Sequence, residues 1–299
     1  MIHTIDLRFL GVEGAVAAFL VETDEGPVLV ETGPHSTIDQ LKAGVAETGH
    51  AITEIRHVLL THIHLDHAGA AWTLAEHGAK IYAHPFGAKH LVSPDRLIAS
   101  ATLIYGAEMD RLWGKMEPIP EAQVVPVLHE QLFRIGGRDF AGFHTPGHAR
   151  HHIAWQLGQD SVFTGDVAGI KVGDGPVQPP CPPPDVDLQD WRKSVQLLRR
   201  LTARQMFLTH FGEVGNKEAH LDELMATLAD WSEWIRLEMR DGQIVQDMMP
   251  AFQRYVERQI RERGGDDAMV ARYDAANPVD MSVTGLVRYW TKLAQEDAP

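Results

Sequence analysis

The segment Thr61-His62-Ile63-His64-Leu65-Asp66-His67 constrains this chain more than any other part of its sequence. It places four potential metal ligands, three imidazoles and one carboxylate, within six residues. Apolar residues accompany them, namely Leu59, Leu60, Ile63 and Leu65. Burial of these polar groups without a compensating ion would be costly. The pattern therefore favours a metal site over a set of solvated histidines.

The spacing within this segment predicts how the side chains can meet. Residues two apart in an extended strand project to the same side, so His62 and His64 face in one direction. Asp66 and His67 lie at the expected turn into the next helix, where both can face the same space. This arrangement serves two adjacent ions better than one.

Three further ligand candidates each follow a predicted strand later in the chain. His148 ends the motif Thr-Pro-Gly-His, Asp166 ends Thr-Gly-Asp, and His210 ends Thr-His. Taken in order, the motifs HxHxDH, TPGH, TGD and TH resemble those of the metallo-β-lactamase-fold superfamily, and most closely its glyoxalase II-like hydrolases. The resemblance covers about residues 1–212.

This resemblance implies an α/β (α+β) fold, a four-layered αββα sandwich that holds its ions at one edge of the paired sheets. It also implies a complete set of ligands for two ions. The set comprises a first group, His62, His64 and His148, a second group, Asp66, His67 and His210, and a bridging residue, Asp166.

Donors of this kind restrict the metal and the reaction. Imidazole and carboxylate without thiolate suit zinc, iron or manganese, and we take zinc as the default for the two divalent ions. Two such ions keep a net positive charge that favours a bridging hydroxide. They also lower the pKa of the bound water and polarise a carbonyl. We expect this hydroxide, oriented by Asp66, to cleave an activated acyl bond in a thioester, lactone or ester.

Two other functions stay open on the sequence alone. A mononuclear iron enzyme that resembles persulfide dioxygenases of the same fold would need only His62, His64 and His148. The identity of the bound metal would separate this alternative from the hydrolase. In the second alternative the protein is a non-enzymatic partner-binding module, in which the metal site is vestigial and the helical tail binds the partner.

Composition restricts the partners and the compartment. The chain has 27 Lys and Arg against 41 Asp and Glu, a formal net charge of −14, so we expect no nucleic-acid partner. The best apolar run, residues 15–21, is too short to cross a membrane, and the amino terminus lacks signal-peptide features. Cys181 is the only cysteine, which favours the cytoplasm. A small-molecule substrate is expected, and a homodimer is left open.

Periodicity predicts two parts of the chain. Residues 1–215 form the expected catalytic domain, in which strand-like runs alternate with helices and the first three strands form an antiparallel meander. Residues 216–299 form a helical extension, because apolar residues recur there at helical spacing without a strand signal. We expect Pro250 to interrupt one of its helices.

Other local expectations concern the surroundings of the site. A helical interlude is predicted over about residues 96–116, and the Pro-rich residues 170–184 are interpreted as a plain connector. His151 stands where related hydrolases more often carry glycine, so we expect it to narrow the mouth of the site. Three aromatic residues are interpreted as core rather than pocket, namely Tyr105, Trp113 and Phe211.

Overall fold

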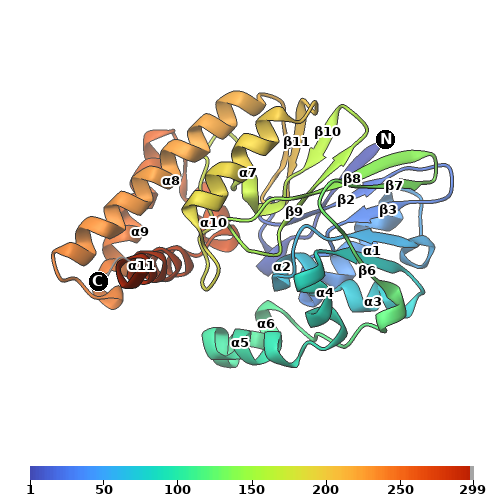
Figure 1. The fold of residues 1–299 in the computed structure, drawn as a ribbon, viewed down its shortest axis with the longest axis horizontal. Helices are drawn as coiled ribbons and strands as arrows, with labels where there is room; N and C mark the ends of the chain where they lie inside the picture. The colour runs from blue at the N-terminus through green and yellow to red at the C-terminus, as the bar shows by residue number, and fades with distance from the viewer. Residues whose placement is uncertain (297–299) are drawn as a thin grey trace.

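Two six-stranded sheets face each other in the computed structural model, which describes residues 1–296 (Figure 1). The first sheet contains, in spatial order, β1 (Ile2–Asp6), β2 (Ala17–Val21), β3 (Val28–Val30), β4 (His57–Leu59), β5 (Lys80–Ala83) and β6 (Val124–Pro126). β1, β2 and β3 pair antiparallel, which confirms the predicted meander, and β3 to β6 pair parallel.

The second sheet is built from the later part of the chain. It contains, in spatial order, β12 (Gly212–Val214), β11 (Gln205–Leu208), β10 (Ser161–Phe163), β9 (Ile153–Leu157), β8 (Arg138–His144) and β7 (Gln131–Ile135). β10 and β11 pair parallel, and the other neighbours pair antiparallel. β8, β10 and β11 therefore run in the same direction and end at the same edge of the sheet.

Helices cover the outer face of each sheet. The first sheet is covered by α1 (Ile38–Glu47), α3 (Ala71–Glu76) and α4 (Pro85–Val92), and the second by α7 (Leu188–Arg200) (Figure 1). The space between the sheets holds aromatic side chains from both, such as Phe19 and Phe163, whose ring centroids lie 5.3 Å apart. These four layers confirm the predicted αββα sandwich.

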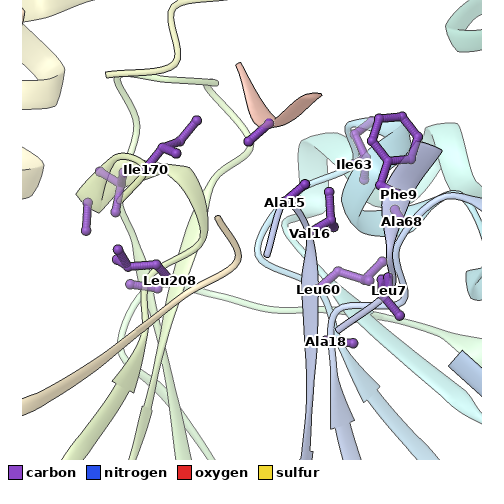
Figure 2. Packing of buried hydrophobic residues seen from close by; sticks show 14 of the residues in the cluster. Leu7, Phe9, Ala15, Val16, Ala18, Leu60, Ile63, Ala68, Ile170 and Leu208 are labelled. Atoms are coloured by element: carbon purple, nitrogen blue, oxygen red, sulfur yellow. The ribbon is translucent and has the colours of Figure 1, made fainter. Parts of the chain in front are cut away.

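A second, larger apolar cluster extends from β1 to the last helix, and part of it lies under the edge of the sheets where the candidate ligands gather. Figure 2 shows Ala15, Val16 and Leu60 at the end of the first sheet, with Ile170 and Leu208 at the end of the second. All five residues are fully or almost fully buried. The loops that carry the candidate ligands are therefore anchored on both sides by packed apolar residues.

The chain continues after β12 with helices that gather at one end of the sandwich (Figure 1). They are α8 (Lys217–Arg240), α9 (Val245–Glu262), α10 (Asp267–Ala276) and α11 (Val279–Glu296). The Trp231 ring packs 5.1 Å from the Phe252 ring, and Trp290 Nε1 donates to the Ser232 carbonyl at 3.0 Å. Among residues 1–296, no helix is both long and apolar enough to cross a membrane.

The predicted helical interlude over about residues 96–116 is confirmed, because α5 (Asp95–Tyr105), a 3-10 turn over Gly106–Glu108 and α6 (Met109–Leu112) occupy most of it, with Gly106 at φ 50° ending α5. Another expectation about the helices is wrong. Pro250 does not interrupt its helix, because it lies inside the continuous α9. Its missing N–H removes one hydrogen bond near the start of the helix, while the face with Phe252 and Val256 stays buried.

Candidate metal centre

Each candidate ligand lies just beyond the carboxyl end of a strand. The HxHxDH segment follows β4 of the first sheet, and His64 is the N-cap of the short α2 (Leu65–Ala68). His148, Asp166 and His210 follow β8, β10 and β11, which end at one edge of the second sheet. The sandwich thus brings both groups of residues to a common edge.

Hydrogen bonds between the two sheets fix this edge. Trp155 of β9 donates its Nε1 hydrogen to the Leu60 carbonyl at 2.9 Å, immediately before the HxHxDH segment. The Ala17 amide donates to the Thr209 carbonyl at 2.8 Å, immediately before His210. Both bonds are buried, and each one ties a ligand-bearing loop of one sheet to the other sheet.

The first group of donors converges closely. His62 Nε2 lies 2.9 Å from His64 Nδ1, and His148 Nε2 lies 3.2 Å and 3.0 Å from these two atoms. A tetrahedral shell with metal–nitrogen bonds of about 2.0–2.1 Å places ligand nitrogens roughly 3.3 Å apart. His148 donates its Nδ1 hydrogen to the Pro180 carbonyl at 2.8 Å, and His62 Nδ1 pairs with the Thr61 hydroxyl at 3.0 Å. Because the Pro180 carbonyl can only accept, this bond leaves a lone pair on His148 Nε2, the atom that faces His62 and His64.

The second group has the same character. Asp66 Oδ2 lies 3.5 Å from His67 Nε2 and 3.4 Å from His210 Nε2. His210 donates its Nδ1 hydrogen to the Ala15 carbonyl at 2.8 Å, so its Nε2 also carries a free lone pair. The Nε2 atoms of His67 and His210 and the Oδ2 atom of Asp66 therefore face one another, as the ligands of one ion would.

Asp166 lies between the two groups. Its Oδ2 atom lies 3.3 Å from His148 Nε2 in the first group. Its Oδ1 atom lies 3.2 Å from His67 Nε2 and 3.4 Å from His210 Nε2 in the second group. One carboxylate oxygen thus faces each group, which is the arrangement that a bridging ligand requires.

Second neighbours hold Asp166 in this position. Its backbone amide donates to His152 Nε2 at 3.2 Å, and His152 Nδ1 pairs with the Thr145 hydroxyl at 2.8 Å. Gly165 has φ +49°, and a Cβ there would lie 2.5 Å from the Thr61 hydroxyl oxygen. Glycine is therefore required at this position both for its backbone conformation and for the close approach.

Burial keeps the first group neutral. It lowers the pKa of His64 to about 3 and that of His62 well below its usual range, and the neighbouring imidazoles lower both further. Burial likewise lowers the pKa of His148, against the opposing effect of Asp166. Neutral imidazoles with free lone pairs are the form that binds a metal ion.

The second group carries an excess of negative charge. Burial lowers the pKa of His67, but the carboxylates of Asp166, Asp66 and Glu31 raise it well above its usual range. Both ring nitrogens of His67 and the Oδ1 atom of Asp166 are buried without a hydrogen-bond partner. These buried atoms lack hydrogen-bond partners, and the surrounding carboxylates create a negative potential that favours a divalent ion. These His and Asp groups can therefore hold metal.

The candidate ligands reach a cavity of about 510 Å³. Its wall includes His64, Asp66 and Asp166, together with Tyr105 and Trp113. The interpretation of Tyr105 as core is therefore wrong, whereas Trp113 lines the cavity and also packs against the core. Phe211 packs against the core between the sheets, as expected, and lines a different cavity. Sequence periodicity does not distinguish residues that line the cavity from residues that pack in the core, because α5 and α6 carry residues of both kinds.

The Pro-rich segment is also part of this site, so its interpretation as a plain connector is wrong. The Pro180 carbonyl accepts the hydrogen bond from His148, and Pro182 and Pro184 line the cavity. His151 lines the cavity as well, with its ring 5.6 Å from the His64 ring, as expected for a residue that narrows the mouth.

Several residues in the wall of the cavity carried no sequence signal. Phe9 and Leu10 come from the first loop, and Pro278 and Met281 come from the turn before α11 and from its first residues. These two segments are far apart in sequence and meet only through the tertiary fold. Local pattern therefore gave no reason to assign them to the site.

Comparisons with known proteins agree with this geometry. The family model described as Metallo-beta-lactamase superfamily matches residues 11–210. The metallo-beta-lactamase fold-containing protein ST1585 of Sulfurisphaera tokodaii is 30% identical over 182 residues, which is 58% of this chain and 68% of that protein. An atrochrysone carboxyl ACP thioesterase of Aspergillus fumigatus is 24% identical over 203 residues, or 65% of this chain and 39% of that protein.

Solved structures show the same fold. The crystal structure of ST1585 superposes with a TM-score of 0.61 at 26% identity, and it covers 74% of this chain and 84% of that chain. TTHA1429 of Thermus thermophilus, a metallo-beta-lactamase family protein, superposes with a TM-score of 0.72 at 20% identity. This second match covers 99% of this chain and 94% of that chain, so the likeness in fold includes the helices that follow β12.

Proposed function

This chain belongs to the metallo-beta-lactamase superfamily, and from that premise we propose that it is a metal-dependent hydrolase of an activated acyl bond. The substrate class is a thioester, lactone or ester, as in the glyoxalase II-like hydrolases. The observation that carries the proposal is Asp166, whose two oxygens face two separate groups of donors at the wall of a cavity.

The donor groups divide the proposed ligands between two ions. Zinc is the ion proposed, with iron or manganese as alternatives. Bound ions supply the Lewis acidity that activates a water molecule and polarises an acyl carbonyl. The ligands would be His62, His64 and His148 for one ion, Asp66, His67 and His210 for the other, and Asp166 between them.

Asp66 has a second task in this proposal. Its side chain is 22% exposed and reaches the cavity, whereas its neighbours His67 and His210 are almost fully buried. Burial raises the pKa of Asp66, but the two histidines outweigh this effect and lower it to about 2. The carboxylate therefore stays ionised and accepts a hydrogen bond from the attacking water, which orients that water toward the substrate.

A protein nucleophile is not part of the reaction. Cys181, the only cysteine, is fully buried, burial raises the pKa of its thiol, and its Sγ donates to the Pro179 carbonyl at 3.5 Å. A buried neutral thiol is a poor nucleophile. Water is therefore the proposed nucleophile. A single unpaired cysteine also supports the proposed cytoplasmic location.

The thioester is the first substrate to test, since relatives named atrochrysone carboxyl ACP thioesterase match this chain. The fungal relatives are longer, and the chain spans 38–53% of their length. The thioesterase activity in these names is that of the fungal proteins. The shared ligand motifs support only the general reaction class for this one.

Turnover on a panel of thioesters, esters and lactones tests the proposal. We expect release of a carboxylic acid that a chelator abolishes and added zinc restores. A phosphodiester and glutathione persulfide complete the panel. Oxygen consumption with the persulfide, together with no cleavage of any acyl substrate, would replace the hydrolase by the mononuclear iron enzyme.

A further inference from the structure

One part of the cavity beside the candidate ligands is strongly apolar. On one side α5 and α6 contribute Ile104 and Leu112, and on the other side Pro278, just before α11, and Met281, in its first turn, line the cavity. Ile104 is exposed although it is apolar. Exposed apolar side chains within a cavity favour contact with an apolar ligand. This part therefore fits the hydrocarbon or aromatic portion of an acyl substrate.

Positive side chains gather at another part of the same cavity, around Phe86 of α4. Lys89 Nζ lies 4.1 Å, and the guanidinium carbon of Arg150 lies 5.2 Å, from the centroid of the Phe86 ring. Phe86, Arg150, His90 and Arg96 line the cavity. We call Lys89, His90, Arg96 and Arg150 the basic rim.

The basic rim lies close to the candidate ligands because α4 packs on their neighbours. A Cβ added to Gly87 of α4 would lie 2.9 Å from the Ile63 side chain and 3.6 Å from that of His151. The His151 ring in turn lies 5.6 Å from the ring of His64. Three residues of the basic rim, His90, Arg96 and Arg150, line the same cavity as the candidate ligands, so a single ligand can contact both groups.

Much of the positive charge on the basic rim is not neutralised. Among residues 1–296, no carboxylate oxygen lies within 4.0 Å of the Lys89 ammonium or the Arg96 guanidinium, while Arg150 pairs with Asp185 at 3.0 Å. Burial lowers the pKa of His90, and Lys89 and Arg96 lower it further, in agreement with a positive local potential. The chain as a whole has a formal net charge of −14, so this concentration of cations is local.

We propose that the basic rim binds an anionic group of the substrate, a carboxylate or a phosphate, while the apolar part of the cavity holds its hydrocarbon portion. Guanidinium groups bind such oxyanions through paired hydrogen bonds, and Arg96 is free to do so. The acyl carbonyl then lies at the candidate metal ligands, between the two ends of the substrate. This inference rests on the proposed hydrolase function and narrows its substrate class to amphipathic anions.

Three thioesters that share one acyl chain length test the proposal. The first is a neutral N-acetylcysteamine thioester, the second carries a carboxylate at the far end of its acyl chain, and the third is the coenzyme A thioester, with phosphates on its leaving group. We expect a KM at least about tenfold lower for one of the charged substrates than for the neutral one. Added salt should raise that KM. If the carboxylated thioester has the lower KM, the bound anion is on the acyl chain; if the coenzyme A thioester has it, the bound anion is on the leaving group.

Variants of the basic rim locate the effect. Arg96→Gln and Lys89→Gln should each raise KM for the preferred anionic thioester about tenfold, leave kcat within about twofold, and leave the neutral thioester unaffected. Arg138→Gln is the matched control, because Arg138 is an exposed arginine on β8 that does not line the cavity. Equal KM values for the neutral and charged thioesters, or equal effects of Arg96→Gln on all three, would overturn the proposal.

Binding of thioether analogues, which cannot be hydrolysed, separates this inference from the proposed function. Calorimetry would compare S-alkyl coenzyme A, a carboxylated S-alkyl N-acetylcysteamine and its neutral counterpart on the purified protein. If no thioester is cleaved but a charged thioether binds in a manner that requires Arg96, the hydrolase proposal fails and the basic rim stands. If the neutral thioester is cleaved and all three thioethers bind equally, the basic rim fails and the hydrolase stands.

Discussion

Asp166 lies between the two groups of candidate ligands. Its replacement should therefore affect the binding of both ions, whereas replacement of a ligand from one group should affect mainly one ion. Asp166→Ala should weaken the binding of both ions at least about tenfold, whereas His210→Ala should chiefly remove one of the two. Elemental analysis of the purified variants, with the exposed His129→Ala as control, gives the stoichiometry. Two ions held by Asp166→Ala with unchanged affinity would disprove the bridging role.

Asp66 is expected to orient the attacking water as well as to bind metal. Asp66→Asn keeps an oxygen donor but weakens the acceptor for the hydrogen bond from water, so kcat should fall about 10²–10⁴-fold. Metal content and kcat are measured on the same sample of the variant. If kcat stays near the wild-type value while both ions are bound, Asp66 has no part in orienting the water.

At this scale the sequence predicts which histidines and aspartates the structure brings together, but it does not predict the residues that line the cavity. His62 and His64 stand two apart in one short segment, and the remaining ligand motifs follow strands in a recognisable order. Trp113 and Met281 carry no such local signal. They reach the cavity only because α6 and α11 lie on opposite sides of it, and no periodicity along the chain encodes that contact.

Among the elements, α11 supports the candidate metal centre through the Pro-rich segment. The Cys181 amide donates to the Ser282 hydroxyl of α11 at 3.3 Å, and the neighbouring Pro180 carbonyl accepts from His148. A Cβ added to Gly285 of α11 would collide with the Cys181 carbonyl oxygen. The helix therefore packs directly on the backbone that orients a candidate ligand.

Gly285→Ala should consequently disturb both stability and metal binding. The added methyl group must displace the backbone at Cys181, which costs about 1–3 kcal/mol of unfolding free energy and shifts the hydrogen-bond acceptor of His148. Urea unfolding and zinc affinity are the two measurements. Gly215→Ala is the control, because a Cβ at Gly215 meets no atom within 4 Å. Wild-type zinc affinity in Gly285→Ala would show that α11 does not influence the candidate metal centre.

The elements themselves were predicted unevenly. The first three strands are apolar runs bounded by glycines, and their antiparallel pairing is confirmed. The continuity of α9 through Pro250 was not predicted, because it depends on packing of the whole helix rather than on one residue. The short α2 and α3 replace one predicted helix after His67, since the chain turns at Gly69 and Ala70 between them.

At the scale of the molecule, the acidic charge predicts the absence of nucleic-acid binding. The formal net charge is −14, and the basic rim is a small feature inside a cavity rather than a stripe that could follow a phosphate backbone. An RNA or DNA mobility-shift assay at physiological ionic strength should show no binding. A complex whose affinity falls steeply with added salt would contradict this prediction.

The sandwich was predictable because the ligand motifs occur in the order that the superfamily uses. The position of the C-terminal helices was not, since amphipathic helices can pack in many ways on the same core. In the structure the connection between α10 and α11 forms one wall of the cavity. Substrate selection is therefore expected to depend on both parts of the chain, residues 1–215 and the helices that follow them.

The most direct test of the central claim is a titration of activity with metal. Protein freed of metal by a chelator is supplied with increasing zinc, and hydrolysis of the best thioester is measured at each step. Activity should rise until about two ions are bound per chain, and the activity of Asp166→Ala should not recover. Full activity with one ion per chain, or acyl hydrolysis that persists without metal, would contradict it.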